Sequence, residues 1–106
     1  MKLGIVLYSN DAELVWNAFR LANFALHEKD TVNVFLLAKG VEYEKLLSEK
    51  YDIVAQAQKF LDAGGKILAC GTCLKLRQQD GSQLCPVSTM KDLHQIIRES
   101  DKIVTF

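Results

Sequence analysis

Three almost continuous apolar stretches alternate along the chain with segments in which apolar residues recur at helical spacing. The continuous stretches are residues 3–8, 32–38 and 66–69. A strand that is covered on both faces carries apolar side chains at nearly every position, so these stretches predict buried strands. Residues 11–27 and 53–61 instead show the spacing of about 100° per residue that is typical of amphipathic helices. The apolar face predicted for the first helix consists of Leu14, Val15, Ala18, Phe19, Leu21, Ala22, Ala25 and Leu26.

Capping residues mark the ends of the predicted helices. One of residues 9–11, which are Ser-Asn-Asp, is expected to cap the first helix. Asp52 fits the N-cap of the second helix, and Gly64 fits its end. Thr89, followed three residues later by Asp92, resembles a capping box and predicts the start of a final helix.

The second half of the chain predicts shorter elements. Residues 41–49 favour a short helix or helical loop, and the polar residues 75–83 favour a helical turn that continues into a loop. Residues 85–87 predict a short extended segment, because proline biases the residue before it toward extended geometry. Residues 101–106 predict a final strand. The apolar face expected for the last helix consists of Met90, Leu93, Ile96 and Ile97.

Strands that alternate with helices imply right-handed crossovers and a mostly parallel sheet. We therefore expect an α/β fold with three layers, in which helices flank a mostly parallel sheet in the general plan of flavodoxin. At 106 residues the chain is long enough for one domain with its own hydrophobic core, so a single domain over residues 1–106 is expected.

Two aromatic residues of the first predicted helix lie outside its apolar face. Trp16 and Phe24 fall among polar positions on a helical wheel. Large aromatic side chains on a polar face often form a second buried surface, such as a subunit contact. Neighbouring loops that cover them are an equally good explanation. Both interpretations stay open at this point.

Composition narrows the range of partners and compartments. Thirteen basic residues balance thirteen acidic residues, which gives no reason to expect nucleic acid or an anionic membrane as a partner. No apolar stretch approaches the length of a membrane span, and the first residues fit a strand better than a signal peptide. Three cysteines are an odd number, which argues against a framework of disulfides. Reduced thiols and a cytoplasmic location are therefore expected.

Cys70 and Cys73 are the main candidates for chemistry. They directly follow the third predicted strand, in the sequence Ala-Cys-Gly-Thr-Cys of residues 69–73. In an open α/β sheet, ligands and reactive groups gather beyond the carboxyl ends of the strands. A thiol reacts as its thiolate, which helix N-termini and nearby cations stabilise. The pair is therefore a candidate catalytic site for sulfur chemistry.

The residues around this pair suit an anionic sulfur. Gly71 and Thr72 lie where the strand can give way to a helix, and their backbone N–H groups are candidate donors to a thiolate or persulfide. Lys75 and Arg77 bring positive charge close by. We expect these four residues to bind the sulfur that the cysteines carry.

Other roles for the cysteines also have to be considered. Free cysteine is often a small core residue, and this is the favoured interpretation of Cys85. Cys70, Cys73 and Cys85 together with His94 have the residue types of a zinc site, although two closely spaced cysteine pairs are absent. A thioredoxin-like dithiol is disfavoured, because that fold places its cysteine pair after an early strand. No metal site is expected.

Cofactor binding is disfavoured at the first predicted strand-to-helix turn. Residues 8–13 contain no glycine-rich loop, and Asp11 and Glu13 place negative charge where a phosphate would bind. FMN, NAD and ATP are therefore not expected, and no cofactor is expected at all. His27 and His94 are expected on helix surfaces.

Several segments together resemble the DsrE/DsrF-like family, which includes TusD-type sulfur carriers and YchN-like proteins. The likeness covers nearly the whole chain. It rests on the strand at residues 3–8, on the cysteine motif at residues 69–74, on residues 85–90 (Cys-Pro-Val-Ser-Thr-Met) and on the terminal residues 101–106. Many relatives have Arg-Gly shortly after the motif, whereas here Arg77 is followed by Gln.

The resemblance implies a small α/β subunit that assembles into homo-oligomers, either trimers or hexamers. In the sulfur-relay members a cysteine after this strand carries a persulfide, received from a protein donor and passed to a protein acceptor. The matching cysteine here is Cys70, with Cys73 as the alternative carrier, as a second acceptor, or as the thiol that resolves the persulfide. The expected function is therefore that of a small cytoplasmic sulfur-relay protein, similar to a sulfurtransferase. The alternative is a non-catalytic oligomeric module whose cysteines are structural or bind a metal.

Overall fold

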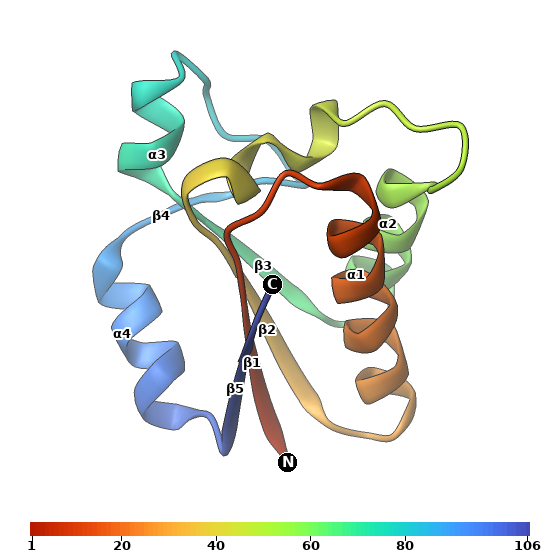
Figure 1. Ribbon diagram of the computed structural model, residues 1–106. Helices are drawn as coiled ribbons and strands as arrows, with labels where there is room; N and C mark the ends of the chain where they lie inside the picture. Colours follow the sequence, from red (N-terminus) through yellow and green to blue (C-terminus); the bar gives the residue numbers. More distant parts are fainter.

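The computed structural model describes residues 1–106 and shows a five-stranded sheet with helices on both faces (Figure 1). The strands lie in the order β4-β3-β2-β1-β5, and every neighbouring pair is parallel. This confirms the predicted three-layer α/β fold. The strands are β1 (Lys2–Leu7), β2 (Thr31–Leu36), β3 (Lys66–Cys70), β4 (Val87–Ser88) and β5 (Lys102–Thr105).

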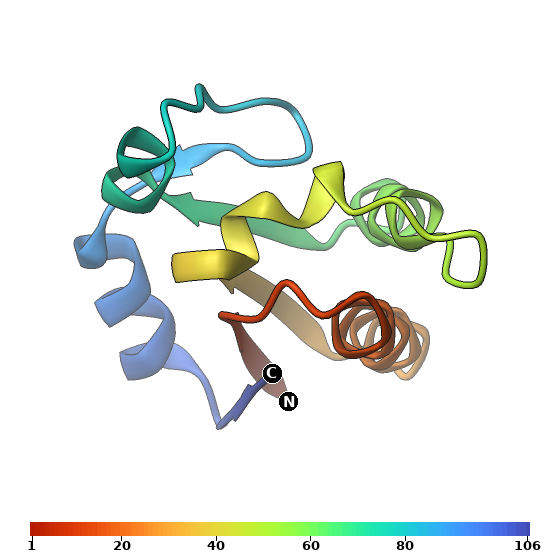
Figure 2. The same ribbon diagram turned by 45° about the horizontal axis from the view of Figure 1, so that its top comes forward.

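The helices divide between the two faces of the sheet. One face is covered by α1 and α2, and the other carries α3 and α4 (Figures 1 and 2). A 3-10 helix, η1, crosses the carboxyl ends of the strands, which Figure 2 brings toward the viewer. No helix has the length and the apolar character needed to cross a lipid bilayer. The helices are α1 (Ala12–His27), η1 (Ala38–Lys45), α2 (Ile53–Asp62), α3 (Gly71–Leu76) and α4 (Met90–Glu99).

Local capping follows the sequence at two helices and departs from it at a third. The carboxylate of Asp11 accepts the Leu14 N–H of α1 at 3.0 Å, and Asp52 accepts an N–H of α2 at 3.1 Å, as predicted. Thr89 is the N-cap of α4, as predicted, but its side chain makes no capping hydrogen bond, so the predicted capping box does not form. Asp92 accepts the hydroxyl of Ser88 at 2.5 Å and so is turned toward the end of β4.

Two predicted apolar faces are broader than the surfaces that the structure buries. In α4, Leu93 and Ile96 are buried, whereas Met90 is 56% and Ile97 is 52% exposed. A single helix lies along this part of the sheet, so only its innermost stripe meets β1 (Figure 1). In α1 the central positions are buried, but Leu14 and Leu21 at the margins of the face remain exposed.

The segment from residue 37 to residue 46 differs most from the expectation. The second strand ends at Leu36, and Ala38 has a left-handed φ of 51° that starts η1. The Leu37 N–H donates to the Leu7 carbonyl at 2.9 Å, which joins the start of η1 to the end of β1. Gly40 lies so close to this carbonyl that a Cβ atom would be 2.0 Å from the oxygen. The predicted helical loop is therefore an earlier and tightly seated 3-10 helix.

Tyr43 anchors η1 in the core. Its side chain is fully buried, and its ring packs 5.2 Å from Phe19 of α1, which in turn lies 6.1 Å from Phe60 of α2. The Tyr43 hydroxyl donates to the carbonyl of Leu84 in the segment that leads to β4. One aromatic residue thus links η1, the α1–α2 layer and the polar loop at residues 77–86.

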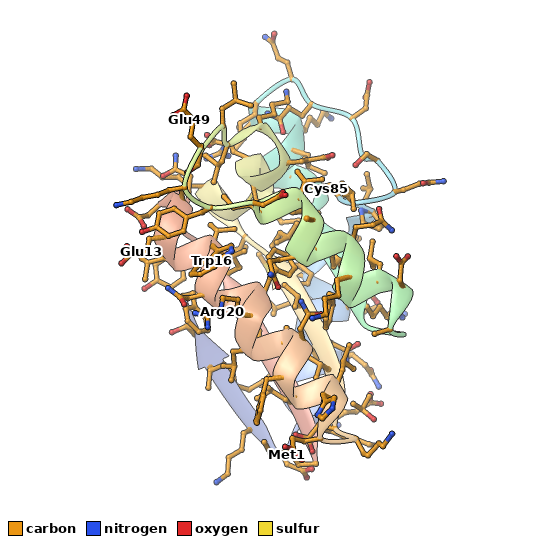
Figure 3. All side chains as sticks on the ribbon, turned by 90° about the vertical axis from the view of Figure 1, so that its right-hand side faces the viewer. Met1, Glu13, Trp16, Arg20, Glu49 and Cys85 are labelled. Atoms are coloured by element: carbon orange, nitrogen blue, oxygen red, sulfur yellow. The ribbon has the colours of Figure 1, made fainter.

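Trp16 is covered, and Phe24 is not. The Trp16 ring lies 5.1 Å from the ring of Tyr51, and the guanidinium of Arg20 sits 4.4 Å above it (Figure 3). Tyr51 also donates its hydroxyl to Glu13 at 2.5 Å, which fixes the loop against α1. Cover by a neighbouring loop is therefore the correct interpretation for Trp16, whereas Phe24 has no such cover.

Substituting Gly40 tests the seating of η1. We expect Gly40→Ala to lower the free energy of unfolding by about 3 kcal/mol, because the added methyl group collides with a backbone oxygen that cannot move aside. The measurement is urea unfolding followed by circular dichroism.

Gly64→Ala is the matched control. A Cβ at Gly64 meets no atom within 4 Å, so alanine there is strained only by the backbone φ of +95°. We expect this strain to lower the free energy of unfolding by about 1 kcal/mol. Equal losses in the two variants would contradict the close seating of η1 on β1.

Candidate functional site

The two motif cysteines lie at the carboxyl edge of the sheet, where β3 passes directly into α3. Cys70 is the last residue of β3 and the N-cap of α3. Its Sγ accepts the backbone N–H of Cys73 at 3.4 Å, as a capping side chain does at a helix start. The residue is only 3% exposed. The local sequence thus places one sulfur inside the edge of the sheet with a backbone donor directed at it.

Cys73 lies one turn further and is half-buried. Its Sγ accepts the backbone N–H of Ala38 from η1 at 3.2 Å. The left-handed conformation of Ala38 brings this N–H to the sulfur. Each motif sulfur therefore accepts one backbone N–H, and the two donors come from different elements.

The pKa of Cys73 is raised above its usual value. Burial is the largest cause, and a side-chain hydrogen bond with Cys70 is the next. The N–H of Ala38 and the charge of Arg77 act in the opposite direction without reversing the shift. The Cys73 thiol therefore ionises less readily than an ordinary thiol.

Arg77 is held by an ion pair instead of facing the sulfurs freely. Its Nε lies 2.7 Å from Oε2 of Glu42, and its Nη1 donates to the Cys73 carbonyl at 3.1 Å. The hydrogen bond from Arg77 is the largest cause that holds the pKa of Glu42 below its usual value. Asn10, in the turn between β1 and α1, also donates to Glu42, at 3.5 Å. Arg77 thus ties α3 to η1, while its charge still lowers the pKa of Cys73.

The remaining predicted residues also lie at this edge, with different surroundings. Gly71 and Thr72 form the first turn of α3, and a Cβ at Gly71 would lie 3.0 Å from the Ser88 carbonyl oxygen. The close approach of β4 therefore favours glycine at that position. Thr72 and Lys75 are exposed, so they present the hydroxyl and the ammonium group to solvent beside the cysteine pair.

Three contributors to the site were not identified from the sequence. Ala38 and Glu42 belong to η1, and Asn10 lies in the turn between β1 and α1. No local motif marks them, because 35 residues separate Ala38 from Cys73 and Glu42 from Arg77. The placement of β2 beside β3 in the sheet is the only signal that brings them near the cysteines.

Cys85 lies apart from the pair, in the core. It is 1% exposed, and its thiol donates to the Val41 carbonyl at 3.7 Å. Burial, with a smaller effect of the Glu44 charge, raises the pKa of Cys85 to about 11. His94 is exposed on α4, and no group of three metal-ligating side chains is assembled anywhere in the structure. The zinc set considered from the sequence is therefore not brought together.

Comparisons with known proteins agree with this fold. The family model described as the DsrE/DsrF-like family matches residues 1–106. An uncharacterized protein of Methanocaldococcus jannaschii is 34% identical over 100 residues, which cover 89% of this chain and 88% of the relative. An uncharacterized protein of Methanopyrus kandleri is 29% identical over 100 residues, which cover 89% of this chain and 83% of the relative.

Solved structures show the same arrangement of elements. The crystal structure of YchN from E. coli superposes with a TM-score of 0.88 at 22% identity, and the match covers 100% of this chain and 99% of YchN. A conserved protein of unknown function from Bacteroides thetaiotaomicron superposes with a TM-score of 0.78 at 18% identity, covering 99% of this chain and 94% of that protein. At these identities the likeness shows the fold.

The core position of Cys85 leads to a prediction about alkylation. With its pKa raised to about 11, Cys85 holds roughly two hundred times less thiolate at pH 8 than an ordinary thiol with a pKa near 8.5. We expect iodoacetamide to leave Cys85 of the native protein unmodified at pH 8 and to modify it fully after unfolding. Peptide mass spectrometry after timed labelling measures both rates. Labelling of native Cys85 as fast as free glutathione would contradict its placement in the core.

Proposed function

The chain belongs to the DsrE/DsrF-like family, which is associated with sulfur relay, and we propose that it carries a persulfide on Cys70. The observation that carries the proposal is the position of this sulfur at the start of α3. Cys70 is the N-cap of the helix, and its Sγ accepts the backbone N–H of Cys73 at 3.4 Å. An anionic sulfur needs such a donor when it is held away from water.

The loading step transfers one sulfur atom between thiols. The Cys70 thiolate attacks the terminal sulfur of a donor persulfide, R–S–SH. A sulfur–sulfur bond forms at Cys70 while the sulfur–sulfur bond of the donor breaks, and the donor leaves as a thiolate, R–S⁻. The products are Cys70–S–SH and the donor thiolate, so the step consumes no external oxidant or reductant. In the unloading step, an acceptor thiolate attacks the terminal sulfur of Cys70–S–SH, and Cys70 leaves as a thiolate.

Cys73 is not the thiol that resolves the persulfide in this proposal. A thiol that resolves the persulfide must itself attack as a thiolate, forming a Cys70–Cys73 disulfide and releasing HS⁻. The raised pKa of Cys73 disfavours that attack at neutral pH. The carried sulfur is therefore kept on Cys70 until an acceptor arrives.

The surroundings of Cys70 give a small sulfur anion no binding site of its own, which supports proteins as the sulfur donor and acceptor. Cys70 is almost fully covered, and the exposed side chains beside it are those of Thr72 and Lys75. Arg77 is neutralised by Glu42, so no strongly cationic pocket faces a small anion. We therefore place a protein sulfur donor and a protein acceptor on either side of the transfer, in the cytoplasm, where thiols stay reduced.

Intact mass spectrometry tests the carrier assignment. The reduced protein is incubated with glutathione persulfide and, separately, with a cysteine desulfurase supplied with cysteine. We expect the wild type to gain the mass of one sulfur atom, Cys70→Ser to gain none, and Cys73→Ser to load and to keep the sulfur as the wild type does. Cys85→Ala is the matched control and should load like the wild type, because Cys85 lies in the core.

The same experiment contains the results that overturn the assignment. Loading of Cys70→Ser together with failure of Cys73→Ser would move the carrier role to Cys73. Failure of every form, under conditions that load an established carrier protein, would favour the non-catalytic oligomeric module.

We also propose that the chain forms a homo-oligomer, a trimer or a hexamer, through the side of the sheet that carries α3 and α4. Several large apolar side chains on this side are exposed, which is unusual for a monomer. They come from α3, from α4 and from the edge strand β5. These residues are Leu76, Met90, Ile97 and Ile103.

A charge on this side is expected to break the oligomer. Ile97→Glu should lower the mass measured by analytical ultracentrifugation toward that of one chain, because burying a carboxylate in an apolar contact is costly. Leu47→Glu is the matched control, since Leu47 is exposed in the loop between η1 and α2. An unchanged mass for Ile97→Glu would contradict the assignment of this face.

A further inference from the structure

A groove lies between the outer faces of α1 and α2, on the side of the molecule that Figure 3 turns toward the viewer. Its volume is about 730 Å³, and its lining runs from Asn17 to His27 of α1 and from Gln56 of α2 to Ala63 just after that helix. Both helices run from the carboxyl edge of the sheet toward the opposite edge (Figure 1). The groove therefore lies away from the cysteine pair and belongs to a different surface.

The charged side chains of the lining are cationic. Arg20 and Lys59 line the groove together with the imidazole of His27, and no acidic side chain does. Of the nearby carboxylates outside the lining, Asp30 pairs with the N-terminal ammonium group at 2.7 Å, and Asp62 accepts from the uncharged amide of Gln58 at 2.9 Å. The whole chain carries equal numbers of acidic and basic residues, so two cations without a carboxylate in the lining are a local feature.

Arg20 is held ready to accept a carboxylate. Its guanidinium stacks on Trp16 at 4.4 Å, and its Nη1 donates to Asn17 Oδ1 at 3.0 Å. A guanidinium that is fixed by stacking loses less freedom when it binds a carboxylate, and its planar fork suits that group. No ion pair within the chain occupies Arg20.

An apolar patch lies between these cations. Phe24 is 62% exposed, and Leu21 stands three residues before it on the same side of α1. Such a patch, bordered by charged groups, suits one apolar side chain of a partner.

The floor of the groove is fixed before any partner binds. Asn23 of α1 donates to both the backbone carbonyl and the side-chain oxygen of Gln56 in α2, each at 3.0 Å. These bonds hold the two helices at a set separation. A preformed groove binds its partner without first having to order itself.

We propose that this groove docks an acidic segment of a partner protein, in which an apolar side chain is flanked by Asp or Glu. The apolar side chain packs on Phe24 and Leu21, and the carboxylates bind Arg20 and Lys59. An anionic membrane fits less well, because lipid surfaces are bound by larger clusters of about four to eight basic residues. The inference does not rest on the proposed persulfide chemistry.

Fluorescence anisotropy with a labelled peptide tests the proposal. The probe is the acidic peptide acetyl-Asp-Glu-Leu-Phe-Asp-Glu-amide, and its control replaces every acidic residue by lysine. We expect the acidic peptide to bind the full chain at low salt, and to bind more weakly as salt screens the contacts. The double variant Arg20→Glu/Lys59→Glu should weaken binding by about tenfold or more, and Phe24→Ser by about fivefold.

The matched control reverses the same amount of charge away from both the groove and the proposed oligomer face. Lys45→Glu/Lys50→Glu changes two exposed residues, at the end of η1 and in the loop before α2, and its binding should equal that of the wild type. Thermal unfolding of each variant establishes that it is folded. Sulfur loading from glutathione persulfide should be unchanged in the groove variants, so a failure of docking and a failure of the carrier function are distinguishable.

Four results would overturn the proposal. The first is no binding of the acidic peptide up to about 1 mM, and the second is equal weakening by the two double variants. The third is preferential binding of phosphatidylserine vesicles over the peptide. The fourth is a change in sedimentation mass of Arg20→Glu/Lys59→Glu, which would make the groove a contact between copies of this chain.

Discussion

The seating of η1 on the carboxyl ends of the strands is the constraint on which the rest of the site depends. Gly40 allows the turn to lie against the Leu7 carbonyl, and Tyr43 fixes the other end of η1 in the core. Between these two anchors, Ala38 donates to Cys73 and Glu42 pairs with Arg77. A short segment without chemistry of its own therefore sets the surroundings of the cysteines. The position of η1 follows from packing, because the close-packed core admits the Tyr43 ring in one orientation only.

Much of the fold could be predicted from local pattern, because buried strands and capped helices leave local signals. The strand that ends at Cys70 and the N-caps at Asp11 and Asp52 are of this kind. The contact of Ala38 with Cys73 could not be predicted, because a left-handed alanine has no sequence signal and its partner lies 35 residues away. The ion pair between Arg77 and Glu42 could not be predicted either, because 35 residues separate the two. From the sequence alone, Arg77 is a free cation.

The errors made from local pattern have a common physical origin. Helical periodicity shows which side chains are apolar, but the number of layers packed against a helix decides which of them are buried. α4 has one neighbouring layer, so Ile97 stays exposed although its spacing fits the apolar face. Trp16 shows the reverse case, since a loop that no periodicity predicts brings Tyr51 over it. Burial at the margins of a helix is thus a tertiary property.

The hydrogen bond from Ala38 to Cys73 has a consequence for spectroscopy. The amide proton of Ala38 has a sulfur atom as its acceptor, so its resonance frequency and its exchange with water depend on where that sulfur points. Any event that draws Cys73 away, such as bonding to its neighbour or displacement by a docked protein, releases this proton to solvent. A backbone amide in a different element from the thiols therefore reports their chemical state, without a label and without a substitution.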